Sequence, residues 1–158
     1  MLKRDEGLSL RFAPDPARGT VIGYGRNVTE HPWFPGEITY FAKKYGPAWV
    51  TRIAQNGIDV NDADLFLLND ITWLEGKLVR YVWFTALDEV RQAVVVMMAY
   101  EMGLEGLLHF PHMLSALTQK NWLAAKQQGL DSEWARDRGT AARAAREMGM
   151  ILSGTWPV

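Results

Sequence analysis

The chain has 158 residues and a mass of 17.9 kDa, the size of one domain with a single core. Its 17 lysines and arginines nearly balance 18 acidic residues, which excludes a strongly basic nucleic-acid binder. Cysteine is absent, so a disulfide framework, a cysteine-based zinc site and a thiol nucleophile are excluded. The N-terminus is charged and no apolar run is long enough for a membrane span, so we expect a cytoplasmically made protein without membrane insertion.

The first part of the chain carries the only sheet signal. Residues 2–10 are expected to form a short helix, and residues 13–19, with two prolines and a glycine, form a turn. Residues 20–25 are rich in β-formers and predict a hairpin strand. Gly23 and Gly25 leave one face of that strand bare, so that something can approach the backbone there. Short helices are expected over 38–45 and 49–54.

Helical patterns follow one another from residue 59 onward. A long amphipathic helix is expected over about 60–80, and a second over 85–102, which is apolar all round in its middle and ends at Gly103. Pro111 begins the next helix, which runs to about residue 118. Three further helices are expected. The first covers 122–128, the second is a short helix capped by Asp131 or Ser132, and the third covers 140–152.

These elements predict an α+β protein organised as a single domain over residues 1–158. A small N-lobe that bears a β-hairpin covers about 12–59, and the helix at about 60–80 joins it to an all-α C-lobe at about 81–158. The N-terminal helix is expected to pack on the C-lobe. The aromatic residues of segment 31–56 are interpreted as the packing of a lobe that has little sheet to bury them.

Two carboxylates stand out as candidate chemistry. Glu6 lies late in, or just after, the first expected helix and Asp15 lies in the turn region before the strand, and glycoside hydrolysis needs two such groups on facing elements. Taken alone this signal is weak, because most of the acidic residues of a chain are solvated. His109 and His112 have no third ligand in the pattern, and the dinucleotide fingerprint fails at Val28, so we expect no metal and no cofactor.

The order of the motifs resembles the phage lysozymes of the T-even type, glycoside hydrolase family 24. The opening similarity runs through Asp5-Glu6-Gly7-Leu8, Asp15 and Ile22-Gly23-Tyr24-Gly25. It continues through Asn69-Asp70, residues 87–93, 98–103, 106–110 and 132–134, and ends with Arg143-Ala144-Ala145-Arg146 and residues 153–156. The resemblance covers nearly all of the chain except about 31–56, and it implies the lysozyme fold with an active-site cleft between the two lobes.

The resemblance also implies the reaction and its residues. The family cleaves the β-1,4 bond between N-acetylmuramic acid and N-acetylglucosamine in peptidoglycan, with inversion. By position, Glu6 is the general acid and Asp15 the second carboxylate. Arg143 matches the arginine that pairs with this glutamate, and Arg146 the one that pairs with Asp5. The positions that match the lining of the family's cleft are Tyr100, Glu101, Met113, Gln128 and Trp134.

The chain departs from the family where the attacking water is held. The family has a threonine immediately before the Ile-Gly pair, and that position is Val21 here, with Thr20 one residue earlier. Thr20 is the candidate catalytic hydroxyl if the strand register is shifted. In the normal register, which we favour, Val21 lines the cleft and Thr20 faces away.

The predicted function is that of a phage endolysin: a monomeric muramidase made in the host cytoplasm that reaches the periplasmic cell wall through a holin-type pore. A tail-associated lysozyme that acts at phage entry is one alternative. A catalytically weakened protein that binds peptidoglycan through a lysozyme fold is the other, and Val21 is the residue that supports it. The aromatic residues of segment 31–56 could also stack on sugars or cover the cleft, which is the alternative to the lobe packing favoured above. The host, the preferred glycan modification and the choice between endolysin and tail lysozyme stay open.

Overall fold

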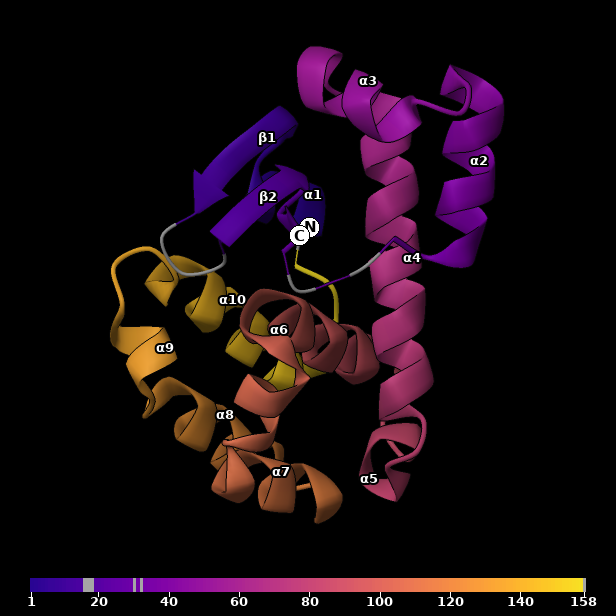
Figure 1. The fold of residues 1–158 in the computed structure, drawn as a ribbon. Coiled ribbons are helices and arrows are strands. Elements are labelled where there is room, and N and C mark those ends of the chain that lie inside the picture. Colours follow the sequence, from indigo (N-terminus) through magenta and orange to yellow (C-terminus); the bar gives the residue numbers. More distant parts are fainter. Residues whose placement is uncertain (16–18, 30, 32, 158) are drawn as a thin grey trace. The chain divides into compact units, whose positions relative to one another are not determined.

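The computed structural model describes residues 1–15, 19–29, 31 and 33–157, which fall into two compact units, Met1–Asp70 and Ile71–Val158. The first unit contains a three-stranded antiparallel sheet together with helices, and the second is helical (Figure 1). The predicted α+β class is therefore confirmed.

The N-terminal helix is shorter than its sequence suggests. Helix α1 (Leu2–Glu6) ends because Gly7 takes φ 69°, a conformation that favours glycine and does not continue a helix. The chain then enters strand β1 (Ser9–Asp15). The prediction of a helix up to residue 10 is thus wrong at its end. Of the turn expected over 13–19, residues 13–15 belong to β1, Gly19 belongs to the next strand, and residues 16–18 lie outside the described part of the chain.

The sheet has the order β1-β2-β3, with β2 (Gly19–Gly23) in the centre and β3 (Arg26–Asn27) as a short third strand. Asp15 lies opposite Gly19, and Ala13 lies opposite Val21. Residues opposite each other share a face of the sheet, and neighbours in one strand alternate. Asp15 and Val21 therefore share one face, and Thr20 belongs to the other.

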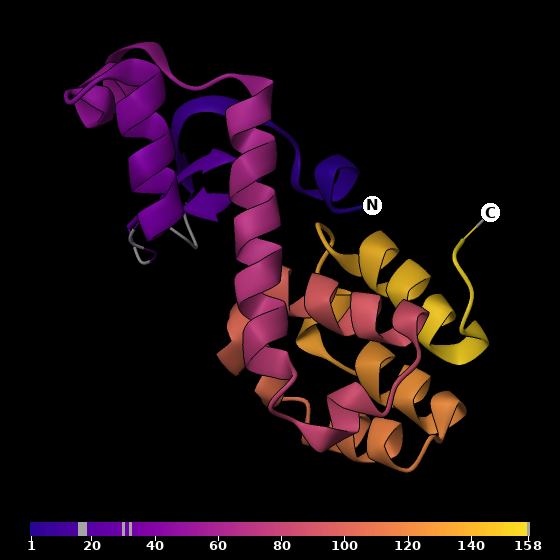
Figure 2. The same ribbon diagram turned by 90° about the vertical axis from the view of Figure 1, so that its right-hand side faces the viewer.

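Three helices complete the first unit: α2 (Pro35–Tyr45), α3 (Trp49–Asn56) and α4 (Val60–Leu78), the last of which continues into the second unit. α2 and α4 lie side by side in both views (Figures 1 and 2). Lys44 of α2 contacts Asp59 at 2.7 Å and the buried Asp62 at 2.6 Å, so ion pairs fix α2 to the beginning of α4.

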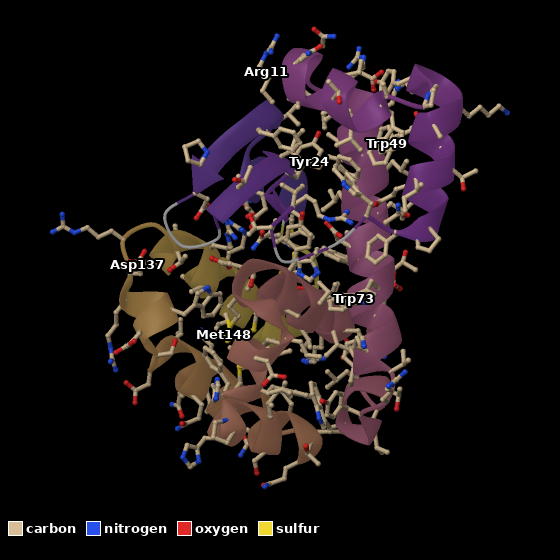
Figure 3. All side chains as sticks on the ribbon, in the orientation of Figure 1. Arg11, Tyr24, Trp49, Trp73, Asp137 and Met148 are labelled. Atoms are coloured by element: carbon tan, nitrogen blue, oxygen red, sulfur yellow. The ribbon has the colours of Figure 1, made fainter. Side chains whose placement is uncertain are left out.

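An aromatic core fills the space between these helices. The ring centroids of Trp33 and Trp49 lie 5.1 Å apart, and those of Phe41 and Trp49 lie 5.4 Å apart. Phe41 and Phe66 are fully buried, and Figure 3 shows Trp49 among the helices of this unit. The interpretation of the aromatic segment as the packing of a small lobe is confirmed.

The second unit is built around α6 (Glu89–Leu108), in which residues 94–99 are all buried. Gly103, at φ 78°, interrupts the helix where the sequence predicts its end, but helical geometry resumes as far as Leu108. The other helices are α5 (Val82–Thr85), α7 (Pro111–Thr118), α8 (Trp122–Leu130), α9 (Glu133–Arg136) and α10 (Ala141–Ser153).

α10 packs against α6, α8 and α9, and it places Met148 in the interior of this unit (Figure 3). None of the described helices is by itself long and apolar enough to cross a membrane. α6 and α7 meet the length and composition for a span only as a pair that is bent by 102°.

Candidate active site

A cavity of about 400 Å³ opens in the first unit, between the end of α1 and one face of the sheet. Its lining includes both carboxylates that the sequence singles out, and otherwise small or apolar groups. The lining residues are Glu6, Leu8, Ser9, Asp15, Val21, Gly23 and Gly25. A cavity of this size with two acidic groups has the volume of a small-molecule site.

Glu6 reaches the cavity because α1 stops directly after it. Gly7 turns the chain away from the helix, and Leu8 and Ser9 continue along the cavity. An ion pair of 2.7 Å between Lys3 and Asp64 ties α1 to α4. The hydrogen bond to Asp64 raises the pKa of Lys3, although this pair is largely exposed and contributes little to stability.

Asp15 reaches the cavity from the last position of β1, on the face that it shares with Val21. The structure therefore has the normal register, with Val21 in the lining as expected for that register. Thr20 lies opposite Pro14 on the other face and is absent from the lining. The expectation that Thr20 supplies a catalytic hydroxyl is corrected accordingly, because strand alternation points its side chain away from Asp15.

Gly23 and Gly25 form a wall of the cavity without side chains. Both have positive φ, 68° and 92°, so a larger residue would be strained at either position. A Cβ atom on Gly23 would also contact Ala63 of α4 at 3.5 Å. The strand predicted over residues 20–25 ends at Gly23, and Gly25 lies in the turn that leads to β3, so the two glycines line the cavity without forming one bare strand face.

A buried charge cluster begins at the residue that follows this wall in the chain. Arg26 follows Gly25 in the chain, is 2% exposed, and donates from Nη1 and Nη2 to the two carboxylate oxygens of Glu37 at 3.0 and 3.1 Å. Asp70 of α4 also contacts Arg26 at 3.0 Å. Burial raises the pKa of Asp70 to about 7, with Glu37 acting in the same direction and Arg26 opposing it.

The second unit contains most of the other predicted site residues. Arg143 of α10 and Glu101 of α6 form an ion pair of 3.0 Å, and both side chains are nearly buried. Trp134 packs edge-on against Phe110, with ring centroids 6.3 Å apart. Tyr100 is half-buried and Gln128 is exposed. The predicted pairs Arg143 with Glu6 and Arg146 with Asp5 join residues of different units and stay predictions.

Met113 does not fit the expectation that it lines a substrate cleft. It is 1% exposed, and its Sδ lies 3.3 Å from where a Cβ on Gly129 would stand. Met113 therefore lies in the core between α7 and α8. The helical pattern of the sequence does not distinguish a buried methionine from one that faces the substrate.

Sequence reasoning missed Leu8 and Ser9 as lining residues, and Glu37 as the partner of Arg26. Leu8 is 45% exposed. The one sequence feature that could have indicated a lining residue here is that Leu8 is apolar and directly follows the glycine that ends α1. Among the residues that the structure describes, no three histidine, aspartate or glutamate side chains gather as metal ligands. The chemistry that this cavity supports is proton transfer and charge stabilisation by two carboxylates.

Comparison with known proteins places the chain among lysozymes. The family model described as phage lysozyme matches residues 3–147. The chain is similar to the pre-baseplate central spike protein Gp5 of Enterobacteria phage T4, with 29% identity over 98% of this chain and 27% of that protein. It is also similar to probable T4-type lysozyme 1 of Dictyostelium discoideum, with 25% identity over 98% of this chain and 93% of that protein. The chain thus spans about a quarter of the spike protein and nearly all of the second relative.

Proposed function

Since the chain belongs to the phage lysozyme family of peptidoglycan hydrolases, we propose that the cavity around Glu6 and Asp15 is the active site of a muramidase. The bond cleaved is the β-1,4 linkage from N-acetylmuramic acid to N-acetylglucosamine. One observation carries the proposal: two carboxylates nine positions apart in the sequence line one cavity beside a wall of two glycines.

Each carboxylate has a distinct task in this reaction. Glu6 donates its proton to the glycosidic oxygen, so that the N-acetylglucosamine leaves as an alcohol. Asp15 stabilises the positive charge that develops on the N-acetylmuramic acid ring and accepts a proton from the water that attacks the opposite face. The bond to the leaving oxygen breaks as the bond to the water oxygen forms, which inverts the anomeric centre.

The product identifies the reaction most directly. Purified protein is incubated with peptidoglycan, and the new reducing ends are analysed by borohydride reduction and mass spectrometry. A muramidase yields N-acetylmuramic acid at the reducing end. N-acetylglucosamine at that end, or an anhydro-sugar, would assign the cavity to a different cleavage.

We further propose that the protein acts as an endolysin. It would accumulate in the host cytoplasm as a monomer and reach the periplasmic wall through a holin-type pore, as the resemblance to T-even lysozymes implies. A tail-associated lysozyme is a second candidate, favoured by the 29% identity to a central spike protein. Immunodetection separates the two, because an endolysin is found in the lysate and a tail lysozyme in purified virions.

The third candidate, a wall-binding protein with weakened catalysis, is favoured by Val21 in the cavity lining. Chloroform-permeabilised Gram-negative cells distinguish it from an enzyme. An enzyme clears the suspension, whereas a binder sediments with the cells and leaves their turbidity unchanged.

A further inference from the structure

We infer that Arg26 and Glu37 form a buried clamp that positions the Gly23–Gly25 wall of the active site, and that Asp70 is a secondary partner of this clamp. The inference deepens the proposed function and rests on it, because the wall matters only if substrate binds in this cavity. Arg26 and Glu37 are positioning residues, since neither is part of the cavity lining.

Arg26 is held in a fixed position directly after the wall in the chain. It is the first residue of β3, directly after Gly25, so any shift of its backbone is transmitted to the wall. The residue is 2% exposed, and its guanidinium carbon lies 4.8 Å from the ring centre of Phe34 and 5.3 Å from that of Phe66. These rings and the carboxylates leave the side chain little freedom to reorient.

Glu37 accepts hydrogen bonds from three different parts of the first unit. Its Oε2 accepts from the backbone N–H of Phe34 at 2.9 Å, and its Oε1 accepts from Asn69 at 2.8 Å. Together with the two bonds from Arg26, it joins the hairpin, the beginning of α2 and the middle of α4. Because the Glu37 carboxylate is fully buried and accepts four hydrogen bonds, it holds the hairpin in place against α2 and α4.

Of the two carboxylates that contact Arg26, Glu37 is the main partner. Glu37 meets the guanidinium in the planar two-bond geometry that is strongest for arginine, whereas Asp70 makes one contact of 3.0 Å. One arginine balances only one carboxylate, and burial of a second negative charge is costly. The raised pKa of Asp70 agrees with this ranking, because a protonated Asp70 leaves a balanced Arg26–Glu37 pair.

Arg26→Lys provides the test, because lysine keeps the charge but cannot form the two-bond geometry. Turnover is measured on soluble peptidoglycan fragments at a temperature at which every variant is folded. Misplacement of the wall disturbs orientation more than affinity, so we expect kcat to fall about 10-fold with KM changed less than about 3-fold. Asp70→Asn is the matched control, and its kcat should stay within about 2-fold of the original protein because the Arg26–Glu37 pair persists.

Amide hydrogen exchange provides a second readout that does not depend on activity. In Arg26→Lys, exchange at residues 21–27 should accelerate about 10-fold, while α3 keeps its protection. If Arg26→Lys does not fold, Glu37→Asp tests the same geometry, since it keeps the charge and shortens the reach. If hairpin exchange is faster in Arg26→Lys but a Glu6 variant keeps its activity, the clamp is supported and the proposed function is rejected. Unchanged exchange together with unchanged kcat in a folded variant would overturn the clamp.

Discussion

Asp15 and Val21 share one face of the three-stranded sheet, because Asp15 pairs with Gly19 and Val21 pairs with Ala13 across β1 and β2. Both side chains line the same cavity. A valine beside the second carboxylate offers the attacking water no hydrogen bond, so Asp15 has to hold that water without a hydroxyl from this position.

Val21→Thr should therefore raise the turnover number, because it adds a hydroxyl on the face of Asp15. Orientation of a bound reactant is worth large factors, and we expect an increase of about 3- to 10-fold. Turnover on soluble fragments measures it. Val21→Ala is the control that changes the volume without adding a hydroxyl, and Thr20→Ala should stay within about 2-fold because Thr20 lies on the other face. A loss of about 100-fold in Thr20→Ala would contradict this account.

The product should have the inverted anomeric configuration. A water between the two carboxyl groups requires them to lie about 6.5–9.5 Å apart in the substrate complex, whereas a separation near 5 Å indicates a retaining enzyme. Proton NMR of the first-formed reducing end, recorded before mutarotation, distinguishes the two. The α anomer is expected from the β-linked substrate, and an initial β anomer would show retention.

Asp70 should make the protein less stable as the pH rises. Its pKa is raised by burial to about 7 in the folded state, from an ordinary value of 3.8, so the folded state binds the proton more tightly. The stabilisation from this proton is complete below the unfolded pKa and is lost as the pH rises towards 7. The free energy of unfolding should fall by about 1 kcal/mol per pH unit across this window.

Asp70→Asn mimics the protonated carboxyl and should flatten this slope. Urea unfolding at about pH 3.5, below the unfolded pKa of Asp70, should give similar stabilities for both proteins, and at about pH 7.5 the variant should be more stable by about 1–3 kcal/mol. A variant that is less stable at the higher pH would show that the ionised Asp70, and not Glu37, is the main partner of Arg26.

Two glycines in the helices of the second unit should respond in opposite directions to replacement by alanine. A Cβ on Gly129 of α8 would overlap with Sδ of the buried Met148, so we expect overpacking to outweigh helix propensity and to cost about 1–2 kcal/mol. A Cβ on Gly149 of α10 meets no atom within 4 Å, so Gly149→Ala should stabilise by up to about 1 kcal/mol. Thermal unfolding measures both, and stabilisation by Gly129→Ala would contradict the packing described for Met148.

The sequence predicts a helix well where its apolar pattern extends over several turns. It predicts a helix end poorly where the conformation of a single residue determines that end. The helix expected over about 60–80 is found as Val60–Leu78, because its apolar spacing extends over several turns. The helix expected to reach residue 10 ends at Glu6, because the conformation of Gly7 overrides the apolar pattern that follows. The helix α5 is too short for a periodic signal.

The candidate site was likewise predicted only in part from the sequence. Glu6, Asp15 and the two glycines are predicted from their order along the chain, and strand alternation correctly separates Val21 from Thr20. The role of Glu37 could not be predicted, because a glutamate at the start of a helix ordinarily serves as a solvated cap. Its burial depends on Arg26 and Asn69, which come from other elements.

The central claim is that Glu6 is the proton donor, and Glu6→Gln tests it most directly because glutamine keeps the shape of the side chain and cannot donate that proton. Clearing of chloroform-permeabilised Gram-negative cells is compared for the original protein, Glu6→Gln and Glu75→Gln, an exposed residue of α4 outside the cavity lining. Loss of a general acid costs about 10²–10⁴ in rate, so Glu6→Gln should abolish nearly all clearing with unchanged circular dichroism, and Glu75→Gln should clear normally. More than about a tenth of the original rate in a folded Glu6→Gln protein would contradict the assignment.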